Sequence, residues 1–245
     1  MNFGIIVQAR MRSSRFPGKV LKKIQNKTLL ELQINRLKHS QKVDMIIVAT
    51  SVEYVDNKIF AECERLGIPC FRGSENNVLE RFYQAAKYYD IDVIIRTNAD
   101  CPFIDAIQID KLIDIWNEKY PNIDYVSNIL EESFPLGMHI EIFSKEAIKI
   151  ALEQSIDKDE HEHVTAYIYR NNTIFRILNV LNDEDLSNYR WTIDYPEDFL
   201  LVKEVYKNFG VANSKFTMTD LVYFFKANPE LQKINSQYKK KQKIL

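Results

Sequence analysis

Cationic and hydroxyl side chains are concentrated in the loop that follows the first apolar segment of the chain. Residues 3–8 are mostly apolar, and residues 8–20 contain four cations, two serine hydroxyls and a Pro-Gly turn. A triphosphate needs fixed cations, which arginine supplies as a planar fork and lysine as a point charge. The loop therefore predicts a phosphate site, with a solvated basic loop as the alternative. The candidate residues are Gln8, Arg10, Arg12, Ser13, Ser14, Arg15 and Lys19.

Familiar glycine-rich phosphate loops do not occur in this sequence. Residues 8–20 do not match GxxxxGK[ST], and the six glycines are nowhere spaced as GxGxxG. The second absence argues against a dinucleotide-binding dehydrogenase. Gly18 still allows the backbone of the loop to approach a ligand closely.

Two aspartates could supply a metal site beside this loop. Asp100 follows the apolar run 93–95, and Asp194 ends a short apolar stretch, so both are expected at strand ends. Mg²⁺ prefers one or two carboxylates, completed by phosphate oxygens and water. The pair therefore predicts a Mg²⁺–triphosphate site. The alternative is that each is a turn aspartate, before Pro102 and Pro196 respectively.

Alternating strand and helix patterns place the basic loop at one edge of a sheet. Short apolar runs predict buried strands, and apolar residues at helical spacing predict the helices between them. This alternation is typical of α/β proteins with a largely parallel sheet, in which ligands bind beyond the carboxyl ends of the strands. The predicted strands span 3–8, 44–49, 68–71, 92–96, 125–128, 139–143 and 174–180, and the predicted helices span 29–39, 57–66, 78–89, 107–118, 144–154 and 197–208.

Length and composition favour one domain in a reducing compartment. We expect a single domain over residues 1–245, with an embellishment at about 130–180 and a helical C-terminal tail at 211–245. A net charge of −1 argues against a nucleic-acid partner. Three cysteines without CxxC spacing do not suggest a disulfide framework. Without a signal peptide or an apolar run of about 20 residues, a cytoplasmic protein with no membrane partner is expected.

Seven segments resemble the acylneuraminate and 3-deoxy-manno-octulosonate cytidylyltransferases. The resemblance is closest to the branch of spore coat polysaccharide biosynthesis proteins of the SpsF type, and it covers roughly the first 210 residues in order. It implies a three-layer, Rossmann-like nucleotide-diphospho-sugar transferase fold with a mostly parallel mixed sheet. The segments are IIVQARMRSSRFPGKVL, ATS, FRGSENNVLERF, RTNADCPFID, FPLGMHIEIFS, HEHVTAYI and RWTIDYPEDF.

The resemblance implies transfer of CMP from CTP to an acidic, nonulosonate-like sugar, with release of pyrophosphate, for surface polysaccharide synthesis. Ala9 would lie against the cytosine, and residues 130–180 would contribute a homodimer interface. The catalytic set would be Arg15, Lys19, Asp100 and Asp194, with the two aspartates holding Mg²⁺. The nucleotide-binding set would be Gln8, Ala9, Arg10, Arg12, Ser13, Ser14, Arg15, Lys19, Arg72, Ser74 and Asn98. Acceptor-side residues would be Pro135, Gly137 and Glu141.

Two positions in the loop differ from the family pattern. Arg12 stands where glycine is common, and Val20 stands where the sialate enzymes have asparagine. The acceptor of the sialate enzymes is therefore not assigned to this chain. The predicted reaction is an in-line attack on the α-phosphorus, with Arg15 and Lys19 stabilising the pyrophosphate that leaves. No residue in the sequence is a convincing general base.

Other interpretations of the sequence remain open. A nucleotide-sugar-dependent glycosyltransferase would use Asp100 for its metal but needs fewer cations than this loop has. A non-catalytic nucleotide-binding subunit would bind CTP without releasing pyrophosphate. The triplet His161-Glu162-His163 lacks HExxH spacing, so a subunit contact is favoured there over a zinc site.

Overall fold

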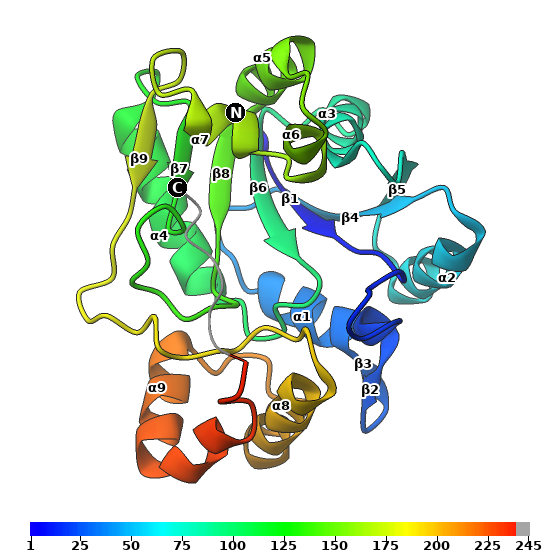
Figure 1. Cartoon of the computed structure of the whole chain (residues 1–245), viewed down its shortest axis with the longest axis vertical. Helices are drawn as coiled ribbons and strands as arrows, with labels where there is room; N and C mark the ends of the chain where they lie inside the picture. Colours follow the sequence, from blue (N-terminus) through cyan, green and yellow to red (C-terminus); the bar gives the residue numbers. More distant parts are fainter. Residues whose placement is uncertain (239–245) are drawn as a thin grey trace.

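A mixed sheet runs through the middle of the molecule, whose structure is a computed structural model that describes residues 1–238. Within these residues, seven strands form the main sheet in the order β5-β4-β1-β6-β8-β7-β9 (Figure 1). The predicted tail at 211–245 and the basic run at 238–243 extend beyond the described residues. The strands are β1 (Phe3–Gln8), β4 (Met45–Ser51), β5 (Cys70–Gly73), β6 (Val93–Asn98), β7 (Tyr125–Ser127), β8 (Glu141–Ser144) and β9 (Ile177–Asn179).

The sheet changes from parallel to antiparallel beside β6. β1 pairs in parallel with both β4 and β6, so that Gln8 lies between Ala49 and Asn98. β8 runs antiparallel to β6 and β7, and β9 is parallel to β7. The predicted α/β class with a mostly parallel mixed sheet is confirmed.

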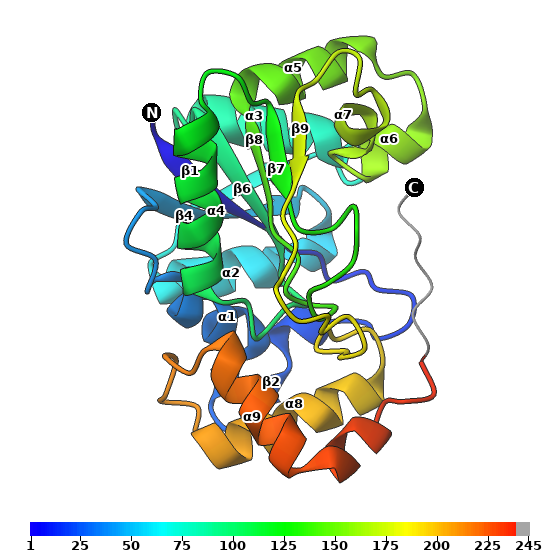
Figure 2. The same cartoon turned by 90° about the vertical axis from the view of Figure 1, so that its left-hand side faces the viewer.

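Helices cover both faces of the sheet and give three layers (Figure 2). Successive side chains of a strand point to opposite faces. Ile5 and Val7 therefore pack with α1, α2 and α4, whereas Ile6 packs with α3, α5 and α7. The helices are α1 (Leu29–Leu37), α2 (Asn57–Leu66), α3 (Val78–Tyr88), α4 (Ala106–Lys119), α5 (Lys145–Gln154), α6 (Lys158–Glu162) and α7 (Ala166–Arg170).

Two C-terminal helices build a separate apolar cluster against α1. α8 (Pro196–Phe209) and α9 (Met218–Ala227) pack around Phe103 and Trp191, both of which are buried. Leu29 and Leu32 of α1 belong to the same cluster. The cluster lies at the end of the sheet where β1 and β6 finish, so it can position residues at that edge (Figure 1).

Most predicted elements are present, with differences where tertiary pairing decides the boundary. The bounds of α2 are those predicted, because Gly67 ends the helix in the left-handed conformation. β5 starts at Cys70 rather than residue 68, since its pairing with Val48 begins there. The hairpin of β2 (Lys23–Ile24) and β3 (Lys27–Thr28) was not predicted, and neither were α6 and α7, whereas α9 lies within the predicted helical tail.

The expected strand-end position of Asp194 is wrong. Asp194 lies in the irregular segment between Arg190, an isolated bridge residue, and the start of α8 at Pro196. Among the described residues, no helix is long and apolar enough to cross a membrane.

Candidate active site

The face of the sheet that packs on α3 and α5 changes from apolar to polar at the carboxyl ends of β1 and β6. Ile6 on β1 and Ile94 on β6 are buried, whereas Gln8, Arg96 and Asn98 further along the same face are polar. In open α/β sheets this edge is where ligands bind. The polar residues line the floor of a cavity.

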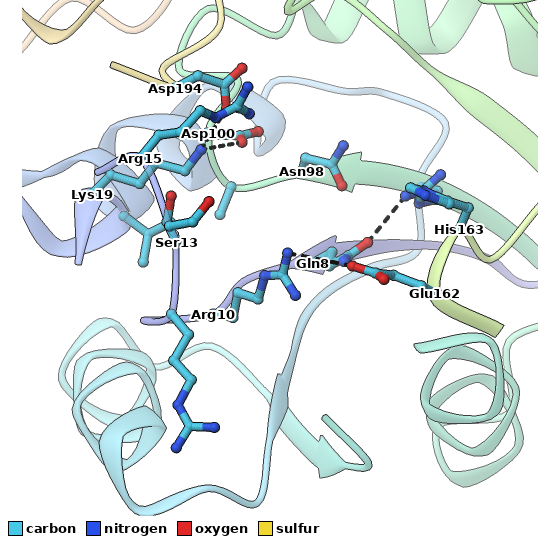
Figure 3. A pocket seen from close by; sticks show the side chains of 15 residues that line it. Gln8, Arg10, Ser13, Arg15, Lys19, Asn98, Asp100, Glu162, His163 and Asp194 are labelled. Atoms are coloured by element: carbon cyan, nitrogen blue, oxygen red, sulfur yellow. Dashed lines mark hydrogen bonds and ion pairs between the residues drawn. The ribbon is translucent and has the colours of Figure 1, made fainter. Parts of the chain in front are cut away.

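The cavity has a volume of about 290 Å³ and lies between the basic loop and the ends of β1 and β6. Figure 3 shows Lys19, Asp100 and Asp194 at one end, Gln8, Glu162 and His163 at the other, and Asn98 between them. The lining residues are Gln8, Arg10, Arg12, Ser13, Ser14, Arg15, Lys19, Val20, Arg96, Asn98, Ala99, Asp100, Glu162, His163 and Asp194.

A buried lysine joins the two predicted aspartates. Lys19 Nζ lies 2.7 Å from Asp100 Oδ2 and 3.1 Å from Asp194 Oδ1, and it donates to the carbonyl of Ile193 at 2.6 Å. Gly18, in the left-handed conformation, precedes the 3-10 turn Lys19–Leu21 and aims the lysine inward. The prediction that the loop and both acids meet at one edge of the sheet agrees with this geometry.

Opposite charges shift the pKa values of Lys19 and Asp194 in favour of their charged forms. Burial lowers the pKa of Lys19, but the negative charges of Asp100 and Asp194 outweigh it and raise the pKa above its ordinary value. Burial raises the pKa of Asp194, but Lys19, with Arg15 and Arg190 behind it, holds that pKa below its ordinary value. Lys19 and Asp194 therefore carry opposite charges at neutral pH.

Hydrogen bonds and ion pairs from Arg15, Arg190 and Asp198 fix the segment that carries Asp194. Arg15 Nη2 lies 2.8 Å from Asp194 Oδ1, and Arg190 Nη2 lies 3.3 Å from Oδ2. Asp198, which is fully buried, accepts the backbone N–H of Asp194 at 2.9 Å and that of Tyr195 at 3.0 Å. It also forms a bidentate pair with Arg190, through two contacts of 2.8 Å.

Arg96 lies at the other end of the cavity. Its Nη1 donates to Glu141 Oε2 at 2.6 Å and its Nη2 donates to Gln8 Oε1 at 3.2 Å. Glu162 and His163 line the same end, and Glu162 Oε1 lies 3.8 Å from Arg10 Nη2. The side chains of Glu162 and His163 are 55% and 54% exposed, so within this chain they contribute to the cavity wall rather than to the core.

Several predicted nucleotide-binding residues lie outside the cavity lining. Arg72 donates to the carbonyls of Ser51 and Glu53, which ties the end of β5 to the segment after β4. Ser74 Oγ accepts the N–H of Asn77 at the start of α3. Ala9 is buried, and its N–H donates to the carbonyl of Ala49.

None of the three predicted acceptor-side residues lines the cavity. Glu141 contacts the cavity through Arg96, which is its partner across β6 and β8. Gly137 has φ of +107° and lies against the backbone of Trp191 and Thr192. Pro135 precedes it in the segment that pairs with residues 189–191.

Four residues that sequence reasoning did not assign to a nucleotide or acceptor site belong to this one. Arg96, Glu162 and His163 line the cavity, and Asp198 supports Asp194. Arg96 stands in the RTNADCPFID segment, and a charged residue directly after a buried apolar run was the available clue.

The carboxylate pair suits a cation that is completed by phosphate. Asp100 and Asp194 converge closely enough for one ammonium group to contact both. Mg²⁺ typically takes one or two carboxylates and obtains its remaining oxygens from phosphate and water. Among residues 1–238, no group of three or more acidic, histidine or cysteine side chains could hold a metal alone. The donor set therefore fits a Mg²⁺ ion that arrives with a nucleotide.

The fold and the site define a class of protein. A largely parallel sheet that carries a cationic loop and a carboxylate pair at its carboxyl edge suits an enzyme that acts on nucleotide phosphates. The chain matches the cytidylyltransferase family over residues 4–228 and belongs to that family. It is therefore a CTP-dependent nucleotidyltransferase, and the family predicted from the sequence is confirmed.

Similar proteins span almost the whole chain. An uncharacterized protein of Methanocaldococcus jannaschii is 39% identical over 96% of this chain and 95% of its own length. Spore coat polysaccharide biosynthesis protein SpsF of Bacillus subtilis is 32% identical over 92% of this chain and 94% of its own length. The structure of a cytidylyltransferase from Leptospira borgpetersenii superposes with a TM-score of 0.92 at 32% identity, covering 99% of this chain and 100% of that one.

Proposed function

We propose that this protein transfers CMP from CTP to an acidic, nonulosonate-like sugar and releases pyrophosphate, as a step in surface polysaccharide synthesis. The observation that carries the proposal is the Lys19–Asp100–Asp194 cluster. The loop that supplies Lys19 contains three further cations. The similarity to a protein of spore coat polysaccharide biosynthesis supports the biological setting.

In the proposed reaction, a hydroxyl oxygen of the acceptor attacks the α-phosphorus of CTP in line with the bridging oxygen. The new P–O bond forms as the bond to pyrophosphate breaks, and the leaving oxygen takes the electron pair. Lys19 and Arg15 stabilise the charge that develops on pyrophosphate. The proton of the acceptor hydroxyl passes to solvent, because we assign no residue as a general base.

We propose that Asp100 and Asp194 hold Mg²⁺ in the nucleotide complex. When bound, Mg²⁺ supplies positive charge to the phosphate oxygens and lowers the pKa of the attacking hydroxyl. The ammonium group of Lys19 contacts the same two carboxylates, so it would lie next to the ion and to the phosphates that the ion contacts. Arg10, Ser13, Ser14 and Asn98 line the same cavity and would contact the nucleotide.

We further propose a single-domain cytoplasmic enzyme that works as a homodimer. α8 and α9 pack on α1 and on the segment of Phe103, which supports one domain rather than two. Residues 130–180 would supply the dimer interface, and in this segment the Ile156 side chain is exposed to 95%. Three free cysteines support a reducing compartment.

A pyrophosphate-release screen tests the function. Each nucleoside triphosphate is offered in turn with a panel of sugar acids, with and without Mg²⁺. Release with CTP and an acid, dependent on Mg²⁺, is expected. Release only with another triphosphate refutes cytidylyl transfer, release only with neutral sugars refutes the acceptor class, and CTP binding without any release indicates a non-catalytic subunit.

The metal assignment has its own test in Asp194→Ala. Turnover should be lost while CTP binding, measured by calorimetry, is largely retained. Glu204→Gln is the matched control, because Glu204 is an exposed acid on α8 that pairs with Lys207 on the same helix. Retained turnover in Asp194→Ala would defeat the metal role.

A further inference from the structure

Arg96 is a partly buried cation at the end of the cavity away from Lys19. Its side chain is 13% exposed and lines the cavity wall. It stands on β6, next to the antiparallel strand β8, whereas the cations of the phosphate loop follow β1 on the other side. A ligand that extends across the cavity from the triphosphate would therefore meet Arg96.

The geometry of Arg96 is set by its partner across the sheet. Arg96 pairs directly with Glu141 in the β6–β8 register, and their side chains form a contact of 2.6 Å. The other Glu141 oxygen accepts from Tyr125 Oη at 2.8 Å and from Thr165 Oγ1. Because Tyr125 and Thr165 occupy one oxygen of Glu141, only the other oxygen contacts Arg96. Glu141 therefore holds Arg96 while using only one of its nitrogens.

Arg96 keeps hydrogen-bonding capacity for a ligand. An arginine has five N–H donors. Nη1 donates to Glu141, Nη2 donates to Gln8, and the buried Nε has no partner among the described residues. Other charges at this end are already engaged, since Glu162 faces Arg10 at 3.8 Å.

We propose that Arg96 binds the carboxylate of the acceptor and so selects an acidic sugar; this inference rests on the proposed cytidylyl transfer. The planar guanidinium fork matches a carboxylate in a way that a lysine or a neutral amide does not. Asn98 lines the cavity between the Lys19 cluster and Gln8, which accepts from Arg96, so it would face the middle of an acceptor anchored at Arg96 (Figure 3). The anchor would leave the rest of the sugar directed toward the α-phosphate.

The opposing explanation is that Arg96 serves only as the counter-ion of Glu141. Arg96→Gln alone does not separate the two, because it leaves a buried carboxylate without its cation and destabilises the sheet. The double variant Arg96→Gln/Glu141→Gln removes both charges together and should recover much of the stability. Under the opposing explanation it should also recover acceptor binding.

Binding is measured directly by ligand-observed NMR titration, so that it does not depend on turnover. The probes are N-acetylneuraminate, 3-deoxy-manno-octulosonate, the carboxamide of each, and glycerol 3-phosphate, with CTP binding followed separately by calorimetry. We expect a sugar acid to bind wild type about 10- to 100-fold more tightly than its carboxamide. Arg96→Gln and the double variant should lose this preference, Arg96→Lys should keep part of it, and CTP affinity should stay within about twofold.

Each other result overturns the inference. Equal binding of an acid by wild type and the double variant would leave Arg96 a structural counter-ion. Binding of glycerol 3-phosphate alone would assign the site to phosphate, and failure of every probe to show Arg96 dependence would remove the anion site altogether. Pyrophosphate release is scored independently: a wild-type enzyme that binds acids through Arg96 but releases none would fail the proposed function and not this inference.

Discussion

Asp198 is the residue whose replacement should most clearly show how the site is held. Its carboxylate is fully buried at the start of α8 and accepts five hydrogen bonds, two from Arg190 and one each from Asn235 and the backbone of Asp194 and Tyr195. Asp198→Asn keeps the shape of the side chain but removes the charge. It also turns one acceptor oxygen into a donor that must face other donors.

The expected cost follows from this arrangement. Removing one partner of a buried ion pair typically destabilises a protein by about 3–5 kcal/mol, because the remaining charge is left uncompensated. The remaining charge here is Arg190, whose other carboxylate contact is Asp194 at a longer 3.3 Å. A domain is typically stable by only about 5–15 kcal/mol, so the variant should lose a large fraction of its stability.

Urea denaturation measures the loss. With a slope of about 2–3 kcal/mol/M, the midpoint should fall by roughly 1–2.5 M. Glu204→Gln, on the same helix but exposed, should change the free energy of unfolding by less than about 0.5 kcal/mol. An Asp198→Asn midpoint equal to that of Glu204→Gln would refute the view that this carboxylate organises the Asp194 segment.

Other predictions concern the same edge of the sheet. Lys19→Met leaves Asp100 and Asp194 without their shared cation, so pyrophosphate release should fall by about 100-fold or more. Gly137→Ala should cost about 1–3 kcal/mol in thermal unfolding beyond Gly67→Ala, because a Cβ at Gly137 would lie 2.7 Å from backbone atoms whereas one at Gly67 meets nothing within 4 Å. Because the pKa of Asp194 is lowered in the folded protein, this group contributes stability above pH 3.8, which is lost as the pH falls through its folded-state pKa. Because the pKa of Lys19 is raised in the folded protein, this group contributes stability below pH 10.5, which is lost as the pH rises through its folded-state pKa. The difference between the denaturation midpoints of wild type and Asp194→Asn should therefore stay constant between about pH 5 and pH 9. The two midpoints should converge in acid.

Local patterns were sufficient to predict the parts of the site that follow the first strands. β1 and the basic loop are adjacent in sequence, and Asp100 comes two residues after β6, which pairs with β1. Buried parallel strands produce continuous apolar runs, so their carboxyl ends are visible in the sequence. The meeting of Lys19 and Asp100 requires these two strand ends to lie side by side and the Gly18 turn to direct Lys19 inward.

The other end of the cavity depends on pairing that no local pattern contains. Arg96 meets Glu141 because β8 runs antiparallel to β6 with one particular register, and a shift of one residue would turn Glu141 to the opposite face. α6, which brings Glu162 to the cavity, has five residues and therefore no apolar periodicity to detect. Glu141 was assigned to the acceptor side by family resemblance, whereas its contact with Arg96 required the fold.

Asp194 shows why a carboxylate outside regular structure can still serve a phosphoryl-transfer site. Such chemistry requires groups held to within about 0.5 Å, which a free loop does not provide. Here the backbone N–H of Asp194 is bound by Asp198 on α8, and Asp198 is bound in turn by Asn235, which lies beyond α9. Tyr195 stacks on Tyr238 with ring centroids 3.7 Å apart, so the chain near its C-terminus braces the segment a second time. In the proposed reaction, the position of Asp194 relative to the α-phosphate would therefore depend on C-terminal packing as well as on the basic loop.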